Sequence, residues 1–125
     1  MTEKNIKRGI YSDFKVVDLG NKEIIFVAGQ IARDENGAIA PDNIETQTEF
    51  VFKSVEKILK EANSSLDDVV KAVVYLTNIK DFSKVSKIRN KYFEKSKPVS
   101  TLVEISATSR PGCNIEIEVT AVRNK

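Results

Sequence analysis

The chain has 125 residues, and we predict that residues 1–125 fold as a single domain with a sizeable core. Hydrophobic residues make up 41% and charged residues 30%, with a formal net charge of +2, which is typical of a globular protein rather than of a polycation. One cysteine and no histidine exclude an intrachain disulfide and a Ser-His or Cys-His catalytic pair, and we expect neither a metal nor a cofactor. No apolar run approaches the roughly 20 residues of a membrane-spanning helix, so we expect a cytoplasmic protein.

The N-terminal half predicts a hairpin followed by a helix. Extended segments at Val16–Leu19 and Ile24–Ala28 flank a Gly-Asn turn, and Lys4–Gly9 is a candidate outer strand. From Ile44 to Ala62, apolar side chains recur at helical spacing opposite charged ones, which indicates an amphipathic helix. Two residues are candidates for its N-terminal cap: Asp42 and Asn43.

The C-terminal half predicts a strand, a helix and two more strands. Val69–Thr77 is apolar on both faces, and Ser100–Ile105 and Ile115–Val122 are the last strands. The helix between them carries an apolar stripe: Phe82, Val85, Ile88, Tyr92 and Phe93. This order of elements predicts an α+β fold in which both helices lie on one face of a sheet.

The last strand separates two kinds of side chain. Ile115, Ile117, Val119 and Ala121 fall on one face, and Glu116, Glu118 and Thr120 fall on the other. We expect the apolar set to meet the helices. Because Val69–Thr77 is apolar on both sides, we predict that another subunit covers the second sheet face; a solvent-exposed face is the alternative.

Several segments, in order and at matching spacing, resemble the reactive-intermediate deaminase (Rid, YjgF-like or RutC-like) family over nearly the whole chain. They are Val27–Ile31, Glu45–Thr48, Ser64–Lys71, Val74–Thr77, Asp81-Phe82, Tyr92-Phe93, Pro98 and Ile115–Glu118. The resemblance implies a chorismate-mutase-like subunit and a homotrimer with an internal barrel of sheets. It also implies small-molecule clefts between subunits and, in active members, cofactor-free hydrolysis of 2-imino acids to 2-keto acids and ammonia.

The same resemblance implies that an arginine holds the substrate carboxylate, because a guanidinium offers two parallel donors. In this chain Ser100 stands at that position, so we expect 2-imino acid deaminase activity to be weak or redirected. Other positions also differ from the family's pattern: Ser12-Asp13-Phe14-Lys15, Ser86 and Leu102. Glu116 keeps the family's carboxylate.

Glu116 is the candidate catalytic residue, as the group that orients or activates water; a structural hydrogen-bond acceptor is the alternative. Arg89 interrupts the apolar stripe of the second helix and is either a substitute anion-binding group or a packed stem whose head reaches solvent or pairs with a glutamate. The remaining candidates for ligand binding are Ser86, Ser100, Thr101 and Gly29. The alternatives are ordinary polar strand positions for Ser100 and Thr101, and a bulge or a strand-end turn for Gly29.

Five lysines follow one side of the second helix: Lys80, Lys84, Lys87, Lys91 and Lys95. A solvated surface explains this stripe better than nucleic-acid binding, because the net charge is small and no stacking aromatic residues lie between the lysines. The primary hypothesis is a homotrimer that acts on or binds small imine, enamine or carbonyl compounds. The alternatives are a non-catalytic ligand-binding or regulatory trimer and an RNA-binding translation inhibitor.

Overall fold

The computed structural model describes residues 10–125, so the candidate strand at Lys4–Gly9 lies outside the described part of the chain. The strands are β1 (Phe14–Asp18), β2 (Lys22–Ile31), β3 (Val69–Leu76), β4 (Val99–Glu104) and β5 (Ile115–Asn124). The helices are α1 (Ile44–Glu61) and α2 (Phe82–Tyr92), and single 3₁₀ turns precede β3 and α2. Among these described residues, no helix is both long enough and apolar enough to span a membrane.

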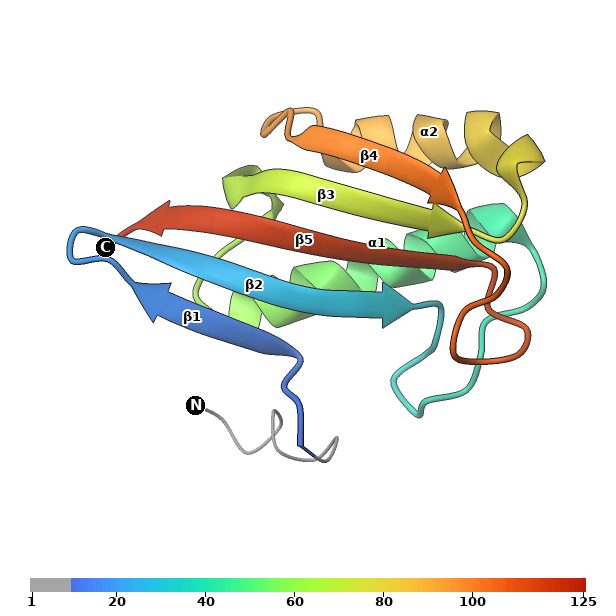
Figure 1. The fold of residues 1–125 in the computed structure, drawn as a ribbon, viewed down its shortest axis with the longest axis horizontal. Coiled ribbons are helices and arrows are strands. Elements are labelled where there is room, and N and C mark those ends of the chain that lie inside the picture. The colour runs from blue at the N-terminus through green and yellow to red at the C-terminus, as the bar shows by residue number, and fades with distance from the viewer. Residues whose placement is uncertain (1–9) are drawn as a thin grey trace.

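The five strands form one mixed sheet in the order β1-β2-β5-β3-β4 (Figure 1). β3 and β4 are parallel, whereas the other neighbouring pairs are antiparallel. Parallel neighbours need a crossover connection, and α2 supplies it. β4 therefore lies at an edge of the sheet with α2 behind it.

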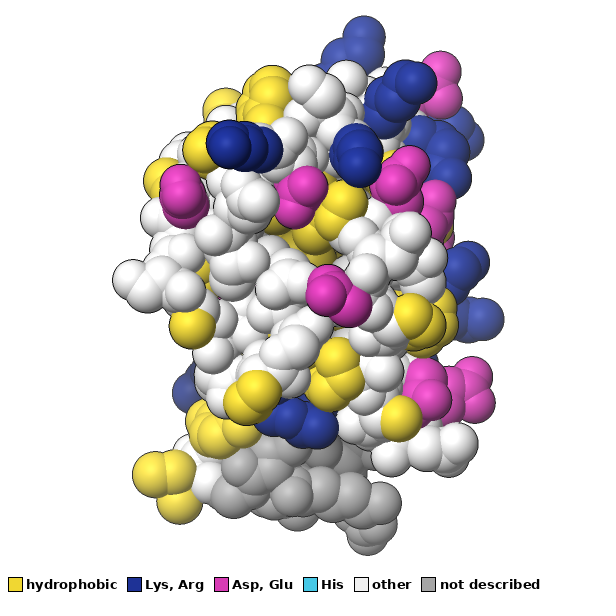
Figure 2. All heavy atoms as spheres, turned by 90° about the vertical axis from the view of Figure 1, so that its right-hand side faces the viewer, with side chains coloured by type: hydrophobic (Ala, Val, Ile, Leu, Met, Phe, Trp, Pro, Cys, Tyr) yellow, Lys and Arg dark blue, Asp and Glu magenta, His cyan; other side chains and the backbone are white. Residues whose placement is uncertain are grey.

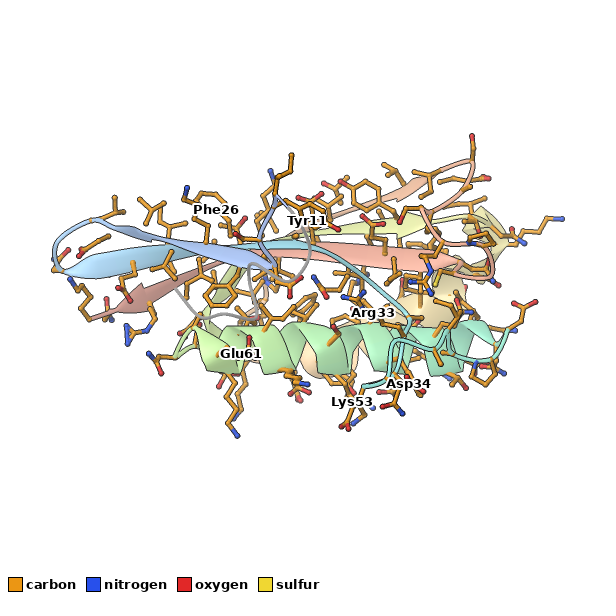
Figure 3. The ribbon with its side chains drawn as sticks, turned by 90° about the horizontal axis from the view of Figure 1, so that it is seen from below. Tyr11, Phe26, Arg33, Asp34, Lys53 and Glu61 are labelled. Atoms are coloured by element: carbon orange, nitrogen blue, oxygen red, sulfur yellow. The ribbon has the colours of Figure 1, made fainter. Side chains whose placement is uncertain are left out.

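Both helices cover the same face of the sheet, which confirms the predicted α+β arrangement (Figures 1 and 3). α1 begins at the predicted residue, Ile44, and ends at Glu61, one residue before the predicted end. Of the two candidate caps, Asn43 is the one used, and its side chain accepts a hydrogen bond of 2.9 Å from the Thr46 backbone N–H. That bond satisfies one of the free N–H groups of the first helical turn.

The core lies between the helices and the sheet. The apolar residues of β5 that were predicted to face the helices, Ile115, Ile117, Val119 and Ala121, are all buried. Phe52 of α1 stacks on Tyr92 with a centroid separation of 4.5 Å and meets Phe93 edge-on at 5.3 Å. These aromatic contacts hold the two helices together, because such pairs add to the free energy gained from burial.

We call the other side of the sheet the open face. Its side chains, identified by strand register, include Ile24 and Phe26 of β2, Val73 and Tyr75 of β3, Thr101 and Val103 of β4, and Glu116, Glu118 and Thr120 of β5. Phe26 is 48% exposed and points away from the helices (Figure 3). The open face thus combines carboxylates with partly exposed apolar side chains.

Strand β2 is longer than its sequence pattern predicted. Its pairing with β5 shifts between Val27 and Gln30, which indicates a β-bulge around Gly29. The bulge changes the alternation of side chains, so that Gln30 and Ile31 are both buried. The strand predicted from simple alternation ended at Ala28, which is too early because alternation does not continue through a bulge.

Candidate functional site

Two glutamates of β5 lie close together on the open face. Glu116 and Glu118 occupy alternate positions of the strand, and both are half-buried. Tyr75 of β3 is the register partner of Glu116, yet its hydroxyl donates a hydrogen bond to Glu118. This bond is the main reason that the pKa of Tyr75 rises to about 12. One carboxylate of the pair is therefore fixed by a neighbouring strand.

Glu116 lies against the bulge of β2. A Cβ atom added to Gly29 would overlap the Glu116 carboxylate, so glycine is required for this close approach. Burial, and secondarily the charge of Glu118, raises the pKa of Glu116 above the usual range of a glutamate. A carboxylate with a raised pKa is a better proton acceptor, which is what a general base needs.

A groove of about 510 Å³ lies between α2, the turn that follows it and β4, and we call it the α2–β4 groove. Its lining includes Arg89, Asn90, Phe93, Glu94, Lys97 and Ser100. Arg89 is half-buried and, among residues 10–125, forms no ion pair. Its guanidinium is therefore available to an anion that enters the groove next to Ser100.

The structure divides the predicted site residues between two faces. Ser100 is the register partner of Ala72, which is buried under the helices, whereas Thr101 pairs with Val73 on the open face. Arg89 and Ser100 thus share the helix-side groove. Gly29, Glu116 and Thr101 belong to the open side. The two groups cannot meet in a single site within one chain.

Comparison with known proteins relates this architecture to a family. The family profile described as Endoribonuclease L-PSP matches residues 3–123. A RutC family protein of Pyrococcus abyssi is 41% identical over 126 residues, which cover 99% of this chain and 94% of the relative. The 2-iminobutanoate/2-iminopropanoate deaminase of Rattus norvegicus is 34% identical over 116 residues, which cover 92% of this chain and 81% of the relative. The chain belongs to the Rid (YjgF-like) family.

Solved structures agree with this assignment. A crystal structure of a Thermotoga maritima protein matches the fold with a TM-score of 0.84 at 35% identity, covering 95% of this chain and 91% of that protein. The Rid resemblance seen in the sequence is therefore confirmed, and so is the fold class. The roles of individual site residues stay predictions.

Ser86, one of the predicted ligand-binding residues, lies on α2 one turn before Arg89. Its hydroxyl is buried and has no hydrogen-bond partner within the described residues. An unsatisfied buried hydroxyl costs free energy, so a polar group that hydrogen-bonds to Ser86 would be stabilising. Ser86 is not among the residues that line the α2–β4 groove.

A second hollow, of about 550 Å³, lies beside α1 and was missed in the sequence. Arg33, Asp34, Lys53 and Glu61 surround it on the helix side of the sheet (Figure 3). Its inner wall includes Gln30, whose side-chain oxygen accepts a hydrogen bond of 3.0 Å from Ser54. The sequence shows these residues as ordinary surface charges, and it was the loop after β2 that brought them together.

The lysine stripe of α2 is partly neutralised in the fold. Lys91 forms an ion pair of 3.0 Å with Glu49 of α1. On the face shown in Figure 2, acidic side chains lie among the basic ones. This mixture favours the interpretation of a solvated surface.

No group of three or more Cys, Asp or Glu side chains in residues 10–125 is arranged to hold a metal ion. The single cysteine, Cys113, is buried with its Sγ 3.8 Å from the Ala32 carbonyl oxygen. Burial raises the pKa of this thiol, which keeps it protonated and unreactive near neutral pH.

Proposed function

We propose that this Rid-family protein hydrolyses small 2-imino acids in clefts between the subunits of a homotrimer. The carboxylate of the substrate binds Arg89, and Glu116 directs the attacking water. The observation that carries this proposal is the position of Arg89 in the groove that Ser100 lines. A rat relative at 34% identity is named as a deaminase of 2-iminobutanoate and 2-iminopropanoate, which supports the substrate class.

Arg89 supplies what Ser100 lacks. A serine hydroxyl donates one hydrogen bond and carries no charge, whereas a guanidinium offers two parallel donors and a positive charge. Because Arg89 lines the same groove from α2, the substrate carboxylate can bind in that groove to a guanidinium from the helix instead of one from strand β4. This would orient the imine carbon for attack.

Glu116 supplies the proton transfers. Water adds to the carbon of the C=N bond, and its proton passes through the Glu116 carboxylate to the nitrogen. The hydroxyl proton of the resulting carbinolamine then passes through the same carboxylate to the nitrogen, and ammonia leaves as the C–N bond breaks and the C=O bond forms. A carboxylate with a raised pKa suits both the acceptance and the return of the proton.

A second copy of the chain completes the site. Within one chain, Arg89 and Glu116 lie on opposite sides of the sheet, so the groove of one subunit must adjoin the open face of the next. Partly exposed apolar side chains on the open face, such as Phe26 and Val103, suit such a contact. The homotrimer is the assembly implied by the family.

The test is ammonia release from freshly generated 2-iminopropanoate and 2-iminobutanoate. Arg89→Ala should lower kcat/KM by about 100-fold, the usual effect of removing one partner of a desolvated charge pair. Lys87→Ala, on the same helix but outside the groove, should change kcat/KM less than twofold. Arg89→Ala with Ser100→Arg should regain activity, because the strand would again supply the guanidinium.

Full activity in Arg89→Ala would overturn the assignment of the anion site. Activity that is unaffected by Glu116→Ala would show that Glu116 is not the base. The second candidate function, a non-catalytic binding trimer, is favoured by the uncharged Ser100. It requires a native protein that binds 2-oxobutanoate saturably in calorimetry and releases no ammonia.

A further inference from the structure

The hydrogen bond between Tyr75 and Glu118 connects β3 to β5 directly beside Glu116. By register, Tyr75 stands opposite Glu116, but its hydroxyl reaches diagonally to the next residue of the open face. Aromatic side chains are long enough for such diagonal contacts between antiparallel strands. Tyr75 therefore packs beside one carboxylate and binds the other.

We propose that Glu118, held in place by Tyr75, is a positioning residue whose negative charge tunes the proton affinity of the neighbouring base, Glu116. The inference deepens the proposed function, on which it rests, by assigning the control of the catalytic base.

The physical reason is an asymmetry between the two carboxylates. The Tyr75 hydroxyl holds the Glu118 carboxylate beside Glu116, and the Tyr75 pKa of about 12 keeps the phenol protonated and able to donate. Glu116 lies against Gly29, and burial opposes its ionisation. Burial and, secondarily, the negative charge of Glu118 therefore both favour the protonated form of Glu116.

The surroundings of Glu116 add few competing charges. β2 offers Gly29 and the buried Ile31, and the loop before β5 carries Arg110 and Cys113. On β4, the open-face neighbours of Tyr75 and Val73 are the uncharged Val103 and Thr101.

The open-face lysines lie farther along the sheet. Lys71 pairs with Thr120, beyond Glu118, and Lys15 lies on β1 opposite Phe26. In the proposed trimer, Arg89 from a second copy also faces the cleft, where the bound substrate carboxylate offsets its charge.

The experiment follows the Glu116 carboxyl carbon by NMR during a pH titration, with the signal assigned by its loss in Glu116→Gln. Glu118→Gln should lower the titration midpoint of Glu116 by about half to one pH unit, because a neighbouring negative charge is removed. Tyr75→Phe should lower it by less, because Glu118 keeps its charge but is no longer held beside Glu116. Glu56→Gln, on the exposed side of α1, should leave it unchanged.

The double variant separates control of the proton from a general structural effect. Tyr75→Phe should have no further influence once Glu118→Gln is present, since the hydroxyl acts through the carboxylate. Additive shifts, or an unchanged midpoint in Glu118→Gln, would overturn the inference. Folding of each variant is checked by circular dichroism, and the isosteric Tyr75→Phe provides an independent test if Glu118→Gln is unstable.

Activity measurements distinguish this inference from the proposed function. The acid limb of the kcat/KM profile should move with the NMR midpoint if Glu116 is the base. A shifted midpoint in a protein without imine hydrolysis would support the control of Glu116 and overturn the proposed function. An unchanged midpoint in an enzyme that hydrolyses imines would support the proposed function and overturn the control of Glu116 by Glu118.

Discussion

The two faces of strand β5 differ in what they contribute to the protein. Ile117 faces the helices and is fully buried, whereas its neighbours Glu116 and Glu118 lie half-buried on the open face. Alternation along one strand therefore separates the residues that stabilise the fold from those available for chemistry. A substitution on the helix-covered face should therefore mainly change stability, and a substitution on the open face should mainly change activity.

The largest effect should come from the helix-covered face. Ile117→Ala should lower the free energy of unfolding by about 3 kcal/mol, because it removes buried methylene groups and leaves a cavity. Thr120→Ala, on the open face of the same strand, should lower it by less than about 1 kcal/mol. Urea unfolding followed by circular dichroism at one fixed protein concentration measures both. Equal losses would contradict the division between the faces.

The next effect should be on assembly. Phe26→Glu places a charge on the open face and should weaken association at least about 100-fold, because the charge would be desolvated at a subunit contact. Val16→Glu adds the same charge to β1 on the other side of the sheet, at a residue that is 37% exposed, and should leave assembly intact. Sedimentation equilibrium shows whether the mass falls toward the 14.0 kDa of one chain. A monomeric native protein would instead favour a solvent-exposed open face.

Gly29→Ala tests the contact between β2 and the candidate base. The added methyl group must displace the Glu116 carboxylate, so kcat/KM for 2-iminobutanoate should fall about 10- to 100-fold. The free energy of unfolding should change by only about 1 kcal/mol, since the carboxylate can move toward solvent. Unchanged kinetics would show that the position of Glu116 does not matter to the reaction.

Local patterns were sufficient to predict most elements of this fold. α1 and β3 begin at their predicted residues because helical periodicity and a run of β-branched residues are properties of the local sequence. The division of β5 into an apolar and a polar face followed from alternation alone. The bulge at Gly29 could not be located in this way, because it depends on how β2 pairs with β5.

The candidate site was less predictable because it depends on contacts between distant segments. Ser100 and Thr101 were proposed together, although alternation already places neighbouring strand residues on opposite faces. The bond from Tyr75 to Glu118 depends on the register of β3 with β5, which no local pattern specifies. Placing Arg89 in the groove beside Ser100 likewise required the crossover that packs α2 behind β4.

The smallest predicted effects concern two glutamates whose pKa values move in opposite directions. On the helix layer, the Tyr92 hydroxyl and then Lys91 lower the pKa of Glu49, so its stabilising contribution is present above the unfolded pKa and is lost as pH falls through the folded value. On the open face, the raised pKa of Glu116 makes its ionised form unfavourable above the folded value, and this penalty disappears below the unfolded value.

Substitution of each glutamate by glutamine should therefore give opposite results at neutral pH. Glu49→Gln should lower the melting temperature at pH 7, whereas Glu116→Gln should raise it, each by an amount corresponding to less than about 1 kcal/mol because both groups retain contact with solvent. Both differences should shrink as the pH falls toward 3, because protonation removes the charge on which each depends. Thermal unfolding measured at pH 3, 5 and 7 distinguishes the two cases. A destabilising Glu116→Gln at pH 7 would mean that the open-face carboxylate stabilises the fold, and the separation of stability from chemistry along β5 would not hold.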